Sequence, residues 1–321
     1  VPHILGSYRA YLDTCTSWES IEENTELFIC FGGVPLKNGQ IAQGGTGSHK
    51  QKEKLIRSAN AGIKFINFSP LKSDLLDEVN GEWLALRPNT DVAIMLGLAH
   101  TLYKEKLYDD KFIKKYTEGF DTFLPYLKGD IDGIVKDANW ASSISEIPSE
   151  KIISLAKEMS SKRTMISVSW SLTRQDHGEQ PFWAAIMLAS MLGQIGLPGG
   201  GFGFGYSATN HIGGQFSIIP GAAFPQTQNK IDDFIPVARI SDLLLNPGGS
   251  FDFDGKEYKY PDIKLIYWAG GNPFHHHQDI NRLLQAWQKP ETIISNEWCW
   301  NSLAKYSDII LPCTTPLERQ D

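Results

Sequence analysis

The sequence predicts an α/β protein with two doubly wound domains, each built on a mostly parallel sheet. Two observations carry this prediction. Short continuous apolar runs recur along the chain, and each ends in turn-forming or polar residues. Continuous rather than alternating apolar runs suit strands that are covered on both faces, as in parallel sheets. Helical stretches separate these runs, and the order strand, crossover helix, strand is typical of a doubly wound fold.

The expected strands all combine an apolar run with a following turn. They are residues 27–31 before Gly32-Gly33, 63–68 before Ser69-Pro70, 164–169 before Trp170-Ser171, 265–269 before Gly270-Gly271, 292–295 before Asn296-Glu297 and 309–311 before Pro312. The residues just after each run are therefore expected at the carboxyl end of a strand.

The expected helices lie between these strands. They are residues 49–61, 89–102, a helix that starts at Ser149, 179–192 and 278–287. The helix 89–102 begins with capping residues and then places Val92, Leu96 and Ala99 on one face. Ser149 is expected to cap a helix with an acidic first turn. The run 179–192 is apolar on nearly every side, so we expect a core helix there.

A stretch rich in glycine, asparagine and glutamine interrupts the pattern between about residues 199 and 230. Long segments without regular structure are unusual inside compact domains and are commonly functional. We therefore expect a domain boundary in this loop. An α/β dinucleotide-binding domain would occupy residues 1–212. A second α/β cofactor-binding domain, incomplete in this sequence, would occupy residues 213–321.

The composition excludes several classes of protein. A formal net charge of −7 over 321 residues argues against a nucleic-acid binder, because no long basic stripe is available. The sequence holds no apolar run of about 18 residues, so we expect no transmembrane helix. The four cysteines, Cys15, Cys30, Cys299 and Cys313, form no C-x-x-C pair. We expect reduced thiols and neither a zinc site nor an iron–sulfur cluster in this chain.

Both ends of the chain indicate an internal piece of a larger enzyme. Val1 is not a methionine, and no signal-like apolar stretch follows it. The chain stops at Asp321 without an element that closes a domain. We therefore expect any targeting signal to lie outside this sequence, which leaves the compartment open.

Ligands of open α/β sheets bind beyond the carboxyl ends of the strands. The candidates that follow from this rule are cations, amides and carboxylates near strand ends: Lys37, Asn38, Ser69, Trp170, Arg174, Asn272, His276, Glu297 and Asp308. Cations and amides suit phosphates, and a carboxylate accepts from both the ring N–H and the exocyclic amine of guanine. For Asp308, a turn residue at the start of a strand is the alternative.

Standard nucleotide motifs are absent. Residues 44–50 are glycine-rich but lack the spacing and the G-K-[ST] ending of a P-loop, so a flexible loop is the competing interpretation. Residues 201–205 follow an expected helix rather than a strand, which excludes a Rossmann fingerprint. The string 270–279, with three adjacent histidines, ends a strand and opens a helix. It suits an anion or nucleotide cradle better than a metal site, and a plain turn is the remaining alternative.

Several long strings resemble the molybdopterin oxidoreductases of the dimethyl-sulfoxide-reductase family, and within it the subgroup of biotin sulfoxide and trimethylamine-N-oxide reductases. The strings are residues 87–91, 171–180, 191–203, 269–283, 308–312 and 317–319. The likeness spans essentially the whole chain. It implies a molybdenum bis(molybdopterin guanine dinucleotide) cofactor and the reduction of an S-oxide or N-oxide by oxygen-atom transfer.

The resemblance also implies roles for individual residues. Lys37 and Asn38 match a loop that approaches one dinucleotide, and Trp170 and Arg174 match a segment that runs along the cofactor. The guanosine end is matched by Ser69, Pro70, Asn89 and Asp91. Asp91 is the expected guanine-reading carboxylate. Contacts to the other dinucleotide are matched by Asn272, His276 and Gln278, with Glu297 and Asp308 beyond them.

The reactive centre is expected outside this chain. The resemblance implies that a serine upstream of Val1 binds molybdenum and that a β-rich domain after Asp321 covers the cofactor, so no catalytic residue is assigned here. The implied partners are an oxide substrate, an electron donor protein or reduced nucleotide, and the rest of the same polypeptide. A nicotinamide- or flavin-dependent dehydrogenase is one alternative, and a non-catalytic nucleotide-binding module is another. The substrate, whether biotin sulfoxide, methionine sulfoxide or trimethylamine N-oxide, stays open.

Overall fold

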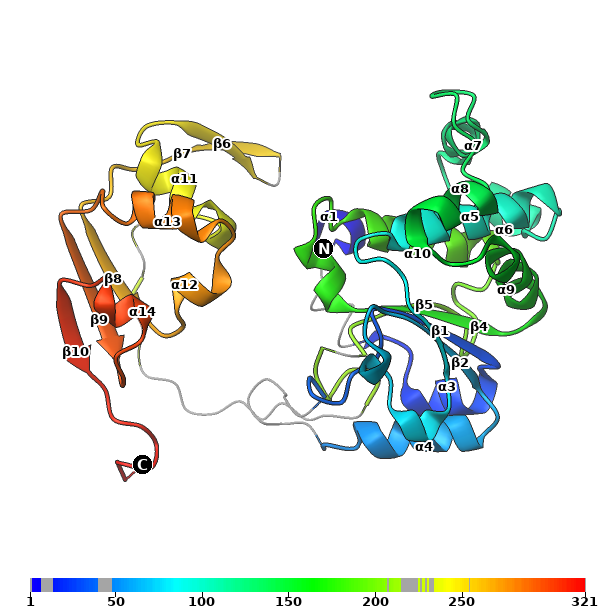
Figure 1. The fold of residues 1–321 in the computed structure, drawn as a ribbon, viewed down its shortest axis with the longest axis horizontal. Helices are drawn as coiled ribbons and strands as arrows, with labels where there is room; N and C mark the ends of the chain where they lie inside the picture. Colours follow the sequence, from blue (N-terminus) through cyan, green and yellow to red (C-terminus); the bar gives the residue numbers. More distant parts are fainter. Residues whose placement is uncertain are drawn as a thin grey trace. The chain divides into compact units, whose positions relative to one another are not determined.

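A computed structural model describes residues 2–6, 14–39, 48–206, 208–214, 234–253 and 255–320, and the single positions 225, 227, 228 and 230. Two compact units make up the chain, Val1–Gly221 and Ala222–Asp321 (Figure 1). The expected boundary near residue 212 and much of the expected loop 199–230 fall beside or within residues outside the described ranges. The position of the boundary therefore stays a prediction.

The first unit is built on a sheet in which every neighbouring pair of strands is parallel. Its strands are β1 (Leu27–Phe31), β2 (Lys64–Phe68), β3 (Glu82–Leu84), β4 (Thr164–Val168) and β5 (Gly201–Phe204). The strand order is β3-β2-β1-β4-β5. The chain moves outward from β1 to β2 and β3, and then returns to place β4 on the other side of β1. The chain therefore winds in opposite directions on the two sides of the β1–β4 pair. A reversal of this kind is a topological switch point.

Helices cover both faces of this sheet (Figure 1). One face carries α3 (Trp18–Asn24) and α4 (Gln51–Asn60), and the other carries α5 (Asp91–Lys104), α8 (Ala138–Ser145), α9 (Ser149–Ser161) and α10 (Gln180–Met191). The unit also contains α1 (Pro2–Leu5), α6 (Asp110–Tyr116), α7 (Phe120–Lys128) and the short 3-10 helices η2 (Lys72–Asp74), η3 (Asp77–Val79) and η4 (Trp170–Arg174). Because both faces are covered, side chains of the central strand such as Phe28 and Ile29 are fully buried.

Close packing explains why α5 and α8 lie in contact. A Cβ on Gly97 would lie 2.7 Å from the Cβ of Ala141, so glycine at this position lets the two helices approach. α5 is buried on almost every side rather than on the single expected face. Ser149 is the first residue of α9 and not its cap, because Pro148 occupies the cap position.

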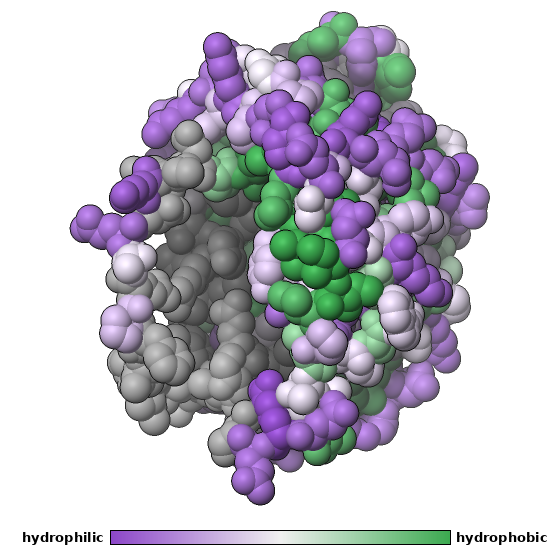
Figure 2. All heavy atoms as spheres, turned by 90° about the vertical axis from the view of Figure 1, so that its left-hand side faces the viewer, coloured by the Kyte–Doolittle hydropathy of each residue, from purple (hydrophilic) through white to green (hydrophobic). Residues whose placement is uncertain are grey.

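The second unit contains a smaller parallel sheet of order β10-β9-β8. Its elements are η5 (Val237–Arg239), α11 (Ile240–Leu245), β6 (Ser250–Phe253), β7 (Lys256–Lys259), β8 (Leu265–Ala269), α12 (Pro273–His276), α13 (Ile280–Ala286), β9 (Thr292–Glu297), α14 (Ser302–Lys305) and β10 (Ile309–Pro312). β6 and β7 form a separate antiparallel hairpin. Figure 1 shows α12, α13 and α14 on one side of the sheet, and Figure 2 shows hydrophobic residues on the outward side.

The α/β class with parallel sheets is confirmed, and the six expected strands all form. The glycine-rich stretch differs from the expectation, because its first residues form β5 beside β4. A Cβ on Gly203 would collide with the ring of Tyr206, so the strand is glycine-rich for steric reasons. Within the described residues, no helix is long and apolar enough to cross a membrane. All four cysteines are free thiols.

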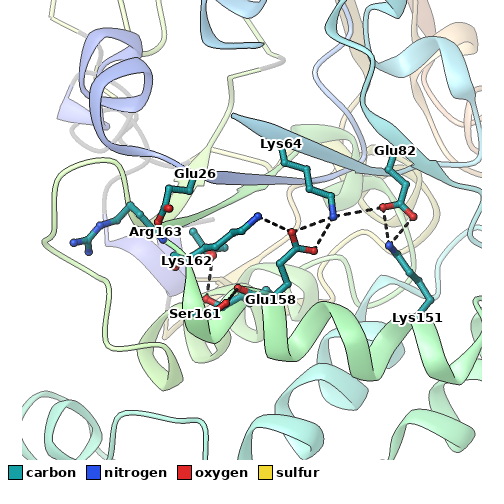
Figure 3. A network of polar contacts seen from close by, with 10 residues as sticks. Glu26, Lys64, Glu82, Lys151, Glu158, Ser161, Lys162 and Arg163 are labelled. Carbon is teal, nitrogen blue, oxygen red and sulfur yellow. Dashed lines mark hydrogen bonds and ion pairs between the residues drawn. The ribbon is translucent and has the colours of Figure 1, made fainter. Parts of the chain in front are cut away.

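An ion-pair network joins the amino ends of β2 and β3 to α9 (Figure 3). Lys64 Nζ lies 2.8 Å from Glu158 Oε2, and Lys162 Nζ lies 2.9 Å from Glu158 Oε1. Glu82 lies 2.6 Å from Lys151 and 4.0 Å from Lys64, so it extends the network. Partial burial raises the pKa of Glu158, but the hydrogen bonds from Lys64 and Lys162 outweigh it and lower the pKa below its ordinary value.

Replacing Glu158 by glutamine is expected to destabilise the protein by about 1 kcal/mol at neutral pH and low salt. A lowered pKa in the folded state means that the carboxylate contributes stability above its ordinary pKa and loses it as the pH falls through the lowered value. The difference between E158Q and the parent in urea denaturation should therefore disappear in acid. Glu105→Gln is the control, because the 3.7 Å pair that Glu105 makes with Lys157 is exposed. Equal losses in both variants would contradict the prediction.

Candidate ligand-binding site

A cavity of about 230 Å³ opens at the carboxyl end of the larger sheet, beside the switch point. Its walls come from the turns after β1, β2 and β4 and from the segment that leads into α5. The lining residues are Gly32, Phe68, Ser69, Pro70, Asp74, Leu86, Pro88, Asn89, Asp91, Ser171, Leu172, Arg174 and Gln175. Of the residues expected from the sequence, Ser69, Pro70, Asn89, Asp91 and Arg174 are thus brought together in one wall.

Two glycines follow β1 beside this cavity, and Gly32 is one of its lining residues. Gly32 and Gly33 follow β1 with φ values of +84° and +73°, in the left-handed region that favours glycine. A Cβ on Gly32 would lie 2.6 Å from side-chain atoms of both Ser169 and Leu172, so the turn after β1 touches the start of η4. A Cβ on Gly33 would collide with the backbone of Asp74. Only glycine lets the three turns meet.

Hydrogen bonds hold the turn after β2 in place. Ser69 is fully buried, and its hydroxyl donates to Asp74 Oδ2 at 2.6 Å while accepting from the Leu71 N–H at 3.2 Å. The other carboxylate oxygen of Asp74 lies 3.5 Å from Lys37 Nζ, which is itself exposed. Ser69 therefore orders the loop. Asp74 is not among the residues expected from the sequence, because its contact with Ser69 depends on how the loop folds.

Asp91 is a buried carboxylate without a side-chain partner. It is the first residue of α5 and is 6% exposed, and no side chain among the described residues hydrogen-bonds to it. Burial raises the pKa of Asp91 to about 6, and a bond from its own backbone N–H opposes that shift. The ionised form is thus costly in the ligand-free protein. A ligand with two adjacent N–H donors would stabilise it.

Two of the other expected residues of the first unit, Arg174 and Asn89, line the same cavity, and three do not. Arg174 is exposed and makes no hydrogen bond or ion pair with any residue in the described ranges, so its guanidinium is available to an anion. Asn89 is exposed, with a left-handed φ of 66°. Trp170 packs edge-on against Phe204, 5.3 Å between ring centroids. Lys37 and Asn38 lie on the loop after β1 and do not line the cavity.

A second group of polar side chains lies at the carboxyl end of the smaller sheet. Asn272 caps α12 by accepting from the Phe274 N–H at 3.0 Å, and its amide donates to the Ser302 hydroxyl at 3.1 Å. Glu297 ends β9, is 8% exposed and accepts from the Asn301 amide at 2.7 Å. Neighbouring atoms Ser295 Oγ and Asn296 Oδ1 are buried without a partner in the described residues. Asn301 and Ser302 gave no signal in the sequence, because they follow the strand by several positions.

The histidine string forms a short helix and an exposed turn. His276 lies at the end of α12, and both His276 and Gln278 are exposed, so they reach solvent beside Asn272. No group of three His, Cys, Asp or Glu side chains within the described residues is placed to hold a metal ion. The structure does not bring Asp308 to this end of the sheet. Asp308 precedes β10, and its carboxylate accepts from the Ile293 N–H at 2.8 Å near the amino end of β9.

A larger cavity lies elsewhere in the first unit. It measures about 1110 Å³ and lies between α5, α6, α7 and α10, where apolar side chains such as Phe120 and Trp183 line it. Its lining includes the carboxylate of Glu118 and three glycines, but no Lys or Arg side chain, and it does not lie at the carboxyl end of the sheet. We therefore place the candidate ligand site at the sheet end, where general rules for α/β folds also put it.

Comparisons with known proteins agree on one family. A family model described as molybdopterin oxidoreductase matches residues 8–321. Biotin sulfoxide reductase of Cereibacter sphaeroides is 47% identical over 319 residues, which cover 99% of this chain and 43% of that protein. Trimethylamine-N-oxide reductase of Haemophilus influenzae is 44% identical over 334 residues, covering 100% of this chain and 40% of that protein. The chain thus spans less than half the length of these relatives.

A solved structure supports the fold. Acetylene hydratase from Pelobacter acetylenicus aligns with a TM-score of 0.55 and 15% sequence identity. The alignment covers 91% of this chain and 41% of that protein. At this identity the likeness shows a shared architecture and nothing about the reaction.

Proposed function

Because this chain belongs to the molybdopterin oxidoreductase family, we propose that it is the cofactor-binding portion of a molybdenum enzyme that reduces S-oxides or N-oxides. The observation that carries the proposal is the buried carboxylate of Asp91, which has no side-chain partner among the described residues, in a cavity at the switch point. That cavity is smaller than the roughly 300–1,000 Å³ typical of a site for a whole drug-sized ligand. Its size suits one end of a longer molecule, such as a single purine.

The residues present fit molybdenum bis(molybdopterin guanine dinucleotide). When bound, this cofactor supplies the redox and oxygen-atom-transfer chemistry, and the protein supplies binding and orientation. Asp91 would accept from the two guanine N–H groups, and Asn89, Ser69 and Pro70 would form the wall around the base. Arg174 would neutralise phosphate charge.

Other residues of the chain would contact the rest of the two dinucleotides. Lys37, Asn38 and Trp170 would lie along the first dinucleotide. The second would be held by side chains at the end of the smaller sheet: Asn272, His276, Gln278 and Glu297. Asp308 stays a proposed contact only through the family resemblance, since its carboxylate is engaged with the backbone of β9.

The proposed substrates are biotin sulfoxide, methionine sulfoxide or trimethylamine N-oxide. The curated relatives carry names for reductases of sulfoxides and of trimethylamine N-oxide, which supports this class without selecting one member. We propose that electrons come from a donor protein or a reduced nucleotide. The molybdenum ligand, a serine, is proposed in the polypeptide upstream of Val1.

The full-length protein, purified from cells that make the cofactor, is expected to contain stoichiometric molybdenum and to release guanine nucleotide on acid treatment. It should reduce the three candidate oxides at different rates with an artificial electron donor. The isolated chain 1–321 should show no turnover under the same conditions, because the proposed metal ligand is not part of it. A full-length protein with neither molybdenum nor guanine nucleotide would sink the proposal, and bound nicotinamide or flavin would favour a dehydrogenase instead.

A further inference from the structure

The outward side of the smaller sheet, seen in Figure 2, is apolar and exposed. Along β8, exposed residues alternate with half-buried ones, and Leu265 and Tyr267 are 55% and 54% exposed. On β10, Ile309 and Leu311 are 46% and 41% exposed. Scattered exposed apolar residues are normal on protein surfaces. Here they lie on neighbouring strands, so they form one surface.

The strand register makes that surface continuous. Tyr267 pairs with Ile294 of β9, and Ile294 pairs with Ile309 of β10, so the three side chains form a row across the sheet. Paired residues on adjacent strands project to the same face. We call the surface formed by Leu265, Tyr267, Ile294, Ile309 and Leu311 the outer face.

The opposite face of the same sheet is covered. Ile293 is 4% exposed and packs in a core with Leu283 and Trp287 of the α13 segment and Leu303 of α14. Parallel sheets occur almost only with both faces covered, because crossover helices pack on them. A parallel sheet with one core face and one apolar open face therefore lacks one layer of its packing.

The direction of the chain explains which layer is missing. The chain runs from β8 to β9 to β10 in one direction across the sheet. Right-handed crossovers that run in one direction place their helices on one face, here the face of α13 and α14 (Figure 1). A right-handed crossover in the reverse direction, from β10 back past β9, would place its helix on the outer face. It would deliver a strand to the open edge of β8.

We propose that a helix of the same polypeptide, in the segment after Asp321, covers the outer face and leads to a further parallel strand beside β8. This inference rests on the proposal that the chain is part of a longer enzyme. The length of the curated relatives supports it, since the chain spans only 40–43% of them. The occupant should be amphipathic, with an apolar stripe against Tyr267 and Ile309 and a polar stripe toward solvent.

Thiol labelling of the full-length protein tests whether the outer face is covered. Tyr267→Cys and Ile309→Cys would be made in a background with the exposed Cys299 and Cys313 replaced by serine. The labelling rate of each folded variant would be compared with the rate of the same variant unfolded in urea, and the ratio of the two rates is the protection. We expect at least 100-fold protection at both positions, and less than 10-fold at the exposed control Gln288→Cys. Labelling of all three at similar rates would overturn the proposal.

A photo-crosslinker at position 267 identifies the occupant. With p-benzoylphenylalanine in place of Tyr267, mass spectrometry should find crosslinks within one polypeptide to residues after Asp321. Crosslinks between two copies, or to residues before Val1, would overturn the assignment. Molybdenum and guanine nucleotide are measured on the same sample. The expected crosslink in a protein without either would refute the proposed function and leave the sheet architecture intact.

Discussion

Replacing Asp91 by asparagine is expected to weaken the binding of guanine nucleotide and, at the same time, to stabilise the cofactor-free protein. A carboxylate accepts from both N–H groups of guanine, whereas an asparagine amide presents one acceptor and one conflicting donor. A bidentate base contact is worth about 1–3 kcal/mol, which corresponds to roughly 5- to 150-fold in affinity. The loss would be measured as guanine nucleotide per mole of purified full-length protein.

The gain in stability follows from the pKa of Asp91. Burial raises this pKa to about 6, so between about pH 4 and pH 6 the folded chain binds a proton that the unfolded chain has lost. Stability therefore falls as the pH rises through this window, and above it the ionised carboxylate costs about 3 kcal/mol. An asparagine side chain at this position does not ionise. The D91N chain should be about 1–3 kcal/mol more stable than the parent at pH 7, and this part of the pH dependence should vanish.

Asp121→Asn serves as the matched control. Asp121 also lies in the first turn of a helix, α7, but it is exposed. Its replacement should change neither the nucleotide content nor the pH dependence of stability. If D91N lowered stability at pH 7 and retained its nucleotide, Asp91 would be a structural residue and the assignment of the guanine site would be wrong.

The second large effect is expected from Gly33→Ala. Gly33 has φ +73° and Gly62 has φ +93°, so alanine is strained by about 1 kcal/mol at either position. The two glycines differ in the space that is available to an added Cβ. A Cβ on Gly33 collides with the backbone of Asp74, whereas a Cβ on Gly62 meets no atom within 4 Å.

A forced displacement of packed backbone adds about 1–3 kcal/mol, so G33A should lose about 2–4 kcal/mol and G62A about 1 kcal/mol. Urea denaturation of both variants measures their free energies of unfolding. The slope of the free energy against urea concentration should be the same in both. G33A should also lose nucleotide, because the turns after β1 and β2 meet at this contact. Equal losses of stability in the two variants would show that the close approach at Gly33 contributes nothing.

The apolar runs predicted β1, β2 and β4 because burial on both faces requires a continuous apolar run. They also predicted β8, β9 and β10, whose second face is apolar although it is not buried. β3 and β5 were missed for different reasons. β3 is short and carries no buried residue. β5 alternates glycine with phenylalanine, a pattern that predicts a loop. What makes β5 a strand is its pairing with β4, and a pairing between distant residues leaves no local pattern.

The candidate site was predictable in part. The rule that ligands bind at strand ends led to Ser69 and Arg174, which line the cavity. Asp91 entered only through family resemblance, because nothing local distinguishes a buried carboxylate at a helix start from an exposed one. Asp308 was grouped with residues that follow strands although it precedes one. Asp74 acts through hydrogen bonds inside its loop, and such contacts depend on the folded backbone.

The switch point also has a consequence for synthesis on the ribosome. β1 pairs with β4, and at the amino end of that pair the Arg163 N–H donates to the Glu26 side chain, 137 positions away. Until the ribosome has released β4, the apolar strand β1 has an unpaired side. Contacts between distant residues form slowly, and exposed strand edges promote aggregation. The cavity at the switch point therefore forms late, and the emerging chain is expected to need chaperone protection until the sheet is complete.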